Sequence, residues 1–151
     1  MKTRIGIIAA VAVAVLGIAW LGARPAAANG PEMTVYKTPT CGCCTKWVDH
    51  MRHHGFRVKV VDLPNLTAVK AQHGVPRALH SCHTAIVDGY VVEGHVPADV
   101  VLSFLEEKTD EVGIAVPGMP MGSPGMEGPY KEPYDVFAFD RNGGGRIFAS
   151  R

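Results

Sequence analysis

Residues 33–55 read MTVYKTPTCGCCTKWVDHMRHHG, and the hydrophobic period changes along them. Residues 33–36 are apolar or β-branched, which predicts a strand, and residues 37–40 interrupt it. Over residues 45–54 the apolar side chains recur at helical spacing, and Gly55 stands where a helix would end. We therefore expect a strand, a short loop and a helix, with three cysteines at the junction of loop and helix.

The elements that follow can be predicted from the same two periods and from turn residues. Asp88-Gly89, the strongest two-residue hairpin signal, separates two apolar runs. The expected elements are a strand over 56–61, a turn over 62–65, a helix ending near His73-Gly74, hairpin strands over 84–87 and 90–93, and a helix over 97–107.

A βαβα unit followed by a β-hairpin and a helix is the arrangement of the thioredoxin-like α/β fold, in which helices cover both faces of a small mixed sheet. The cysteine positions favour the same fold, because thioredoxin-like proteins keep their chemistry between the first strand and the first helix. A single domain over residues 33–151 is expected from a chain of this length.

The C-terminal part has a different composition. Residues 113–129 are rich in Gly, Pro and Met and show no period, which predicts a Met-rich loop. Residues 134–140 alternate as a strand, a glycine-rich turn follows, and residues 146–149 return. We expect a C-terminal hairpin over residues 134–149 that holds the far end of the loop.

The first 28 residues have the pattern of a signal peptide. Lys2 and Arg4 precede an apolar run of 17 residues from Ile5 to Leu21, and Ala26-Ala27-Ala28 is the small-residue pattern that signal peptidase recognises. We expect export and cleavage after Ala28, which would place the protein in the periplasm. An uncleaved membrane anchor is the alternative, because the run approaches the lower limit for a spanning helix.

Cleavage would leave 123 residues with 12 basic and 14 acidic side chains, a formal charge of about −2. Such a surface offers no basic footprint for nucleic acid and no polybasic patch for anionic lipid. We therefore exclude nucleic acid as a partner and expect membrane contact only through an uncleaved leader. Export would also place the cysteines where disulfides are permitted.

Cys41, Cys43 and Cys44 lie at a predicted helix N-terminus, where free N–H groups and the helix dipole favour thiolates. Cys41 and Cys44 form a C-x-x-C pair, which suffices for a redox dithiol, and Cys43 is an additional sulfur inside it. The crowding argues against two stapling disulfides, which would spread the cysteines to close long loops. The cluster instead indicates a site for soft metal.

Charge favours several Cu(I) ions over one ion. Four buried thiolates around a single Cu(I) would leave about three uncompensated negative charges, and one Zn(II) would leave about two. Several Cu(I) ions that share sulfurs would neutralise the site best. Zinc is therefore the weaker candidate.

Cys82, in Ser81-Cys82-His83-Thr84, is the candidate fourth ligand. In a thioredoxin-like fold this loop lies against the cysteine-rich turn, which would bring Cys82 to the other three sulfurs. The alternative is a free buried cysteine of the core. His83 is a candidate ligand, and His95 could be a ligand, support one, or make an ordinary polar contact.

The Met-rich loop adds thioethers, which are soft ligands that select Cu(I). Met119 is the candidate accessory ligand, whereas Met121 and Met126 have no assigned role. The alternative is that these methionines fill gaps in the core beneath the loop.

These motifs resemble those of a known family, the CopG-like periplasmic proteins of copper-resistance clusters, formerly a domain of unknown function. The resemblance covers nearly all of the chain beyond the leader. The motifs that carry it are Pro39-Thr40-Cys41-Gly42-Cys43-Cys44, Gly74-Val75-Pro76, Ser81-Cys82-His83-Thr84-Ala85, Gly89-Tyr90, Glu93-Gly94-His95-Val96-Pro97-Ala98 and Gly113-Ile114-Ala115-Val116-Pro117-Gly118-Met119-Pro120.

The resemblance implies a thioredoxin-like fold, a periplasmic location and copper bound through the cysteines. The expected partners are copper ions and other copper-handling proteins of the cell envelope. Two alternatives stay open from the residues. One is a thiol-disulfide or Cu(I)/Cu(II) oxidoreductase that uses Cys41 and Cys44, and the other is a structural zinc site.

Overall fold

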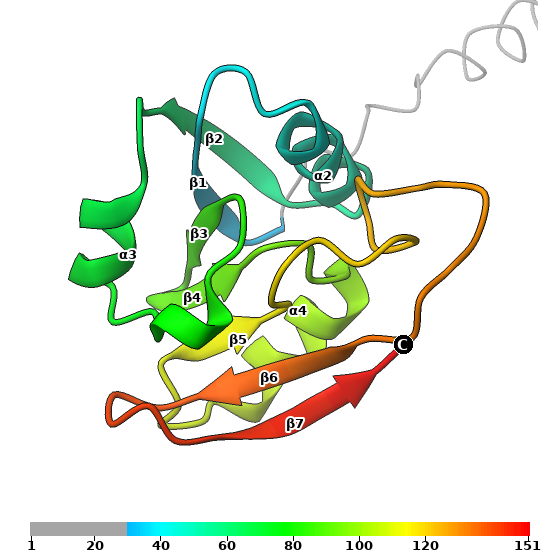
Figure 1. Ribbon diagram of the computed structural model, residues 1–151. Helices are drawn as coiled ribbons and strands as arrows, with labels where there is room; N and C mark the ends of the chain where they lie inside the picture. The colour runs from blue at the N-terminus through cyan, green and yellow to red at the C-terminus, as the bar shows by residue number, and fades with distance from the viewer. Residues whose placement is uncertain (1–29) are drawn as a thin grey trace, which may run out of the picture.

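The computed structural model describes residues 30–151, so the predicted leader over residues 1–28 lies outside them (Figure 1). Among residues 30–151, no helix combines the length and the apolar character that crossing a membrane requires.

A seven-stranded mixed sheet, in the order β2-β1-β3-β4-β5-β6-β7, organises this part of the chain (Figure 1). The pairs β1–β2 and β4–β5 are parallel and the other neighbours are antiparallel. The strands are β1 (Glu32–Lys37), β2 (Arg57–Asp62), β3 (Thr84–Val87), β4 (Tyr90–Glu93), β5 (Gly113–Ala115), β6 (Asp135–Phe139) and β7 (Gly145–Ser150). The helices are α2 (Gly42–His53), α3 (Thr67–Gln72), α4 (Ala98–Glu107) and the 3-10 turn η1 (Arg77–Leu79).

The predicted succession of βαβα, hairpin and helix is confirmed, and the hairpin strands β3 and β4 have the predicted bounds. Its two turn residues, Asp88 and Gly89, have φ angles of 48° and 85°. Two consecutive positive φ angles are what a type I′ turn requires. The other strands of this unit and the third helix begin or end within one residue of their predicted limits, and α2 begins three residues early.

The predicted loop over residues 113–129 is wrong at its first three residues, which form β5. This strand pairs parallel with β4 and antiparallel with β6, and all three of its residues are buried. A Cβ at Gly113 would lie 2.1 Å from the Val91 carbonyl oxygen. The strand therefore depends on pairing with distant strands and on a glycine at residue 113, because any side chain there would collide with β4. Local composition reveals neither cause. The predicted C-terminal hairpin is present as β6 and β7.

The main core lies where α2 and α4 cover one face of the sheet, and Trp47 and Phe104 are the largest side chains of these helices in it. The other face carries a smaller cluster, in which Val75 packs with Val91 and Phe139. Trp47 is fully buried, and its indole Nε1 donates a hydrogen bond of 2.9 Å to the Val96 carbonyl. Since Trp47 follows the cysteines by one helical turn, its burial fixes the N-terminus of α2.

Candidate metal centre

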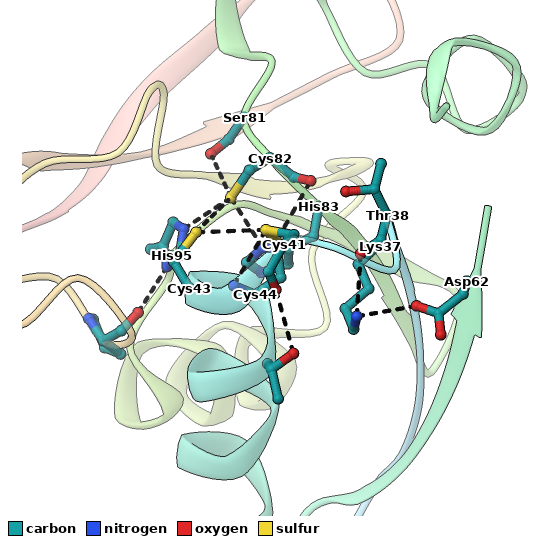
Figure 2. The surroundings of a disulfide bond; sticks show 12 residues. Lys37, Thr38, Cys41, Cys43, Cys44, Asp62, Ser81, Cys82, His83 and His95 are labelled. Carbon is teal, nitrogen blue, oxygen red and sulfur yellow. Dashed lines mark hydrogen bonds and ion pairs between the residues drawn. A yellow bond between two sulfur atoms is a disulfide. The ribbon is translucent and has the colours of Figure 1, made fainter. Parts of the chain in front are cut away.

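The N-terminus of α2 holds three cysteines in one place (Figure 2). Cys41 is the N-cap residue, with extended backbone, and its Sγ accepts a hydrogen bond of 3.3 Å from the Cys44 amide. This bond occupies an amide that the helix itself leaves unpaired, so the helix begins at Gly42 and not at residue 45. The predicted position of the three sulfurs at a helix N-terminus is confirmed.

Cys41 and Cys44 are joined by a disulfide, whereas Cys43 and Cys82 are free thiols. The sequence argued against two stapling bridges, and within residues 30–151 the one bridge present lies inside the C-x-x-C pair. The Cα atoms of Cys41 and Cys44 are 5.3 Å apart, a separation suited to a disulfide. A set of four thiolates therefore exists only after this bond is reduced.

Cys82 reaches the other sulfurs from the loop that precedes β3 (Figure 2). Its Sγ lies 4.0 Å from the Cys43 Sγ, which is 3.5 Å from the Cys41 Sγ. All four sulfurs lie within 4.8 Å of one another. The sheet explains this meeting, because Thr84 at the start of β3 pairs with Tyr36 near the end of β1. The expected approach of Cys82 to the trio is thus present in the geometry.

Two buried histidines complete the site. His95 Nε2 lies 2.9 Å from the Cys82 Sγ, and His83 Nδ1 lies 3.4 Å from the same sulfur. The other His95 nitrogen, Nδ1, is 2.7 Å from the Pro124 carbonyl oxygen, which can only accept. His95 Nδ1 therefore carries the hydrogen, and the Nε2 lone pair faces the sulfur.

His83 is fully buried between Trp47 and His95, with ring centroids 4.3 and 5.0 Å away. Its Nε2 has no hydrogen-bond partner among residues 30–151. Cys82, His83 and His95 offer a sulfur and two nitrogens within 4.8 Å of one another. This is a mixed set of soft and borderline donors that shares Cys82 with the four-sulfur cluster.

Burial sets the protonation states of these groups. It raises the pKa of the Cys82 thiol to about 12, and the neighbouring Cys43 adds to this effect. Burial also lowers the pKa of His95, and lowers that of His83 well below its ordinary value with a further contribution from His95. At neutral pH the imidazoles are therefore neutral donors, whereas a metal ion would have to displace the proton of Cys82.

The methionines are less closely placed. The Ser81 hydroxyl donates to the Gly118 carbonyl, so the Met-rich loop passes beside Cys82, and the next residue, Met119, is 52 % exposed. A Cβ at Gly128 would lie 2.2 Å from the Met121 sulfur, so Met121 packs within its own loop. Met126 is partly buried. The structure thus leaves Met119 largely at the surface, next in the chain to the residue that Ser81 contacts beside Cys82.

Sequence reasoning left the role of His95 open and did not identify Pro124. The available signal was Glu93-Gly94-His95, a turn that places a histidine directly after a buried strand. The Pro124 carbonyl could not be found in this way, because its contact depends on how the loop folds back.

A protein family described as "Protein of unknown function, DUF411" matches residues 79–126, which include Cys82, His83, His95 and Met119. Two similar solved structures are "Copper resistance protein copG- Form 1" and "Form 2". The first is 44 % identical, with 81 % of this chain and 98 % of that chain covered and a TM-score of 0.76. The second is 43 % identical, with 80 % and 98 % covered and a TM-score of 0.76. No curated protein sequence matches the chain.

Proposed function

Since this chain belongs to the CopG-like copper-resistance family, we propose that it binds copper as a periplasmic protein of copper homeostasis. The observation that carries the proposal is the meeting of four sulfurs, from α2 and from the loop before β3, within 4.8 Å. We also interpret strands β2-β1-β3-β4 and their helices as a thioredoxin-like unit. Export by a leader over residues 1–28 belongs to the same proposal.

We infer that the bound ion is Cu(I) and that several ions share the sulfurs. Thiolates are soft ligands, and sharing them among several monovalent ions neutralises a half-buried anionic cluster better than one ion would. Cys43 and Cys44 are adjacent in the chain, which suits bridging between ions. His83 and His95 would add neutral nitrogen ligands or support, and Met119 an exposed thioether.

Copper binding in this form requires the Cys41–Cys44 disulfide to be reduced. The oxidised chain retains only two thiols, Cys43 and Cys82, with their sulfurs 4.0 Å apart. We therefore expect the reduced protein to take up more copper than the oxidised protein.

The test is an anaerobic titration of the reduced protein with Cu(I) against a chromophoric chelator. We expect more than one Cu(I) per chain, and we expect Cys82→Ser to lower both stoichiometry and affinity. Ser103→Ala is the matched control, because Ser103 lies on the exposed side of α4 and donates only to its own helix. An end point at one ion or fewer, or a Cys82→Ser protein that titrates like the wild type, would contradict the cluster.

A second candidate function is favoured by the disulfide itself. With Cys43 Sγ 3.5 Å from Cys41 Sγ, the C-x-x-C pair is placed for thiol-disulfide exchange. In the copper version of this chemistry, the Cys41 and Cys44 thiols would lose two protons and two electrons as they form the disulfide. Two Cu(II) ions would each take up one electron. Insulin reduction that Cys41→Ser abolishes would favour exchange with protein substrates, whereas its absence would favour copper binding alone.

A further inference from the structure

A buried ion pair lies beside the loop that carries Cys82, outside the sulfur cluster. Lys70 of α3 contacts Glu93, the last residue of β4, through Nζ and Oε1. The two side chains are 8 % and 0 % exposed. Both charges are thus removed from water at the end of the sheet where Cys82 enters the site.

The Glu93 carboxylate also binds the two residues that flank Cys82-His83. Oε1 accepts a hydrogen bond of 2.7 Å from the Ser81 amide, and Oε2 accepts one of 2.7 Å from the Thr84 hydroxyl. Lys70 Nζ donates a further bond of 3.0 Å to the Thr84 hydroxyl oxygen. The ion pair therefore holds the segment 81–84 at both of its ends.

Global stability alone does not account for this arrangement. Burying a charged pair has a large desolvation cost, and apolar side chains of similar volume often stabilise a fold as well or better. What apolar side chains would not provide is the set of hydrogen bonds to Ser81 and Thr84. Bonds to a charged acceptor are short and directional, so they restrict the segment more than packing does.

We propose that Lys70 and Glu93 are positioning residues for Cys82: by fixing Ser81 and Thr84 they hold the Cys82 sulfur beside Cys43. The consequence for copper rests on the proposed function, but the position of the sulfur can be tested without metal. Among residues 30–151, neither side chain forms a hydrogen bond or ion pair with a sulfur, so both act through the Ser81 amide and the Thr84 hydroxyl that they bind.

The test uses the effective concentration of the Cys43 and Cys82 thiols for each other. In a Cys41→Ser/Cys44→Ser background, one glutathione disulfide oxidises the two remaining thiols to a disulfide and leaves two glutathione molecules. The equilibrium in glutathione buffers of known ratio gives the effective concentration. Lys70→Met/Glu93→Leu removes the charges and the bonds together, and should lower it by about tenfold or more, the size that one hydrogen bond to a charged group accounts for.

Two comparison variants separate positioning from loss of stability. Lys70→Met/Glu93→Gln keeps an acceptor oxygen for Ser81 or Thr84, so its effective concentration should fall less. Phe104→Leu weakens the core where Phe104 packs on Tyr90 and Phe148, and should leave the thiol pair unchanged. If the Lys70→Met/Glu93→Leu protein does not fold, Thr84→Val removes the two hydrogen bonds of the Thr84 hydroxyl, leaves the Lys70–Glu93 ion pair in place, and should still lower the effective concentration.

An unchanged effective concentration in a folded Lys70→Met/Glu93→Leu protein would overturn the proposal, as would an equal fall in Phe104→Leu. Cu(I) titration of the same variants with Cys41 and Cys44 restored gives a separate result. A wild-type protein that binds no copper, together with the expected fall in effective concentration, would refute the proposed function and leave the positioning role intact.

Discussion

At the level of single residues, the chemistry of the site is constrained by His95, whose Nε2 lies 2.9 Å from the Cys82 Sγ. The Pro124 carbonyl fixes the tautomer of His95, and burial keeps the ring neutral by lowering its pKa. The nitrogen that faces the sulfur is therefore a lone-pair donor that is available either to the thiol proton or to a metal ion.

Replacing His95 by Phe should lower the Cu(I) affinity of the reduced protein by about 10- to 100-fold, because an aromatic ring is kept while the nitrogen that faces Cys82 and the one that contacts Pro124 are both lost. Competition against a chromophoric Cu(I) chelator measures the change. His54→Gln is the control, since His54 is exposed and its ring contacts its own helix and the neighbouring His50. An affinity within about threefold of the wild type would mean that His95 does not take part in binding.

His50 gives a prediction for stability. Its Nε2 accepts a hydrogen bond of 3.1 Å from the Ala98 amide at the start of α4, and burial, followed by His54, lowers its pKa below 6.5. The unfolded chain therefore binds this proton more tightly than the folded chain. The contribution of neutral His50 to the free energy of unfolding is complete above pH 6.5 and is lost as the pH falls through the lowered pKa.

Urea denaturation at pH 8 and at pH 5.5 should therefore show a smaller acid loss of stability in His50→Gln than in the wild type. Other buried histidines contribute equally to both proteins, so the difference isolates His50. Identical pH dependence in the two proteins would show that the protonation of His50 does not contribute to the acid loss of stability.

A secondary-structure element could be predicted when neighbouring residues determine it, and was missed when distant parts of the chain determine it. The hairpin of β3 and β4 was predicted at its limits because Asp88-Gly89 fixes the turn by its own backbone preferences. Strand β5 was missed because three residues carry no readable period, and their pairing with β4 and β6 is decided by distant parts of the chain.

Gly113→Ala tests the explanation of β5. The added Cβ would lie 2.1 Å from the Val91 carbonyl oxygen, which is backbone and cannot turn aside. The free energy of unfolding should fall by more than about 2 kcal/mol, as measured by chemical denaturation. Gly42→Ala is the matched control, because nothing lies within 4 Å of its Cβ and helix propensity favours Ala by up to about 1 kcal/mol. Equal stabilities of the two variants would contradict the explanation.

For the candidate site, the sequence predicted which sulfurs would meet but not their oxidation state. Cys41, Cys43 and Cys44 are neighbours by sequence alone, whereas the approach of Cys82 followed from the expected fold. The ligand role of Met119 remains a prediction, since its side chain is half exposed near the site. Contacts such as those of Pro124 and of the Lys70–Glu93 pair arise from packing between elements, which motif and period do not encode.

Across the whole molecule, the sheet brings two segments together at one candidate metal site, and the redox state of Cys41 and Cys44 determines how many of its sulfurs are thiols. The oxidised chain offers the thiols of Cys43 and Cys82, whereas the reduced chain offers four. Copper loading and disulfide reduction should therefore be linked, since ligation requires thiolates.

Copper K-edge X-ray absorption of the reduced, copper-loaded protein tests the central claim most directly. We predict an edge of Cu(I), a first shell dominated by sulfur, and a short copper–copper vector that weakens in Cys82→Ser. A first shell of nitrogen and oxygen alone, or a sulfur shell without any copper neighbour at full loading, would contradict a shared-sulfur Cu(I) cluster.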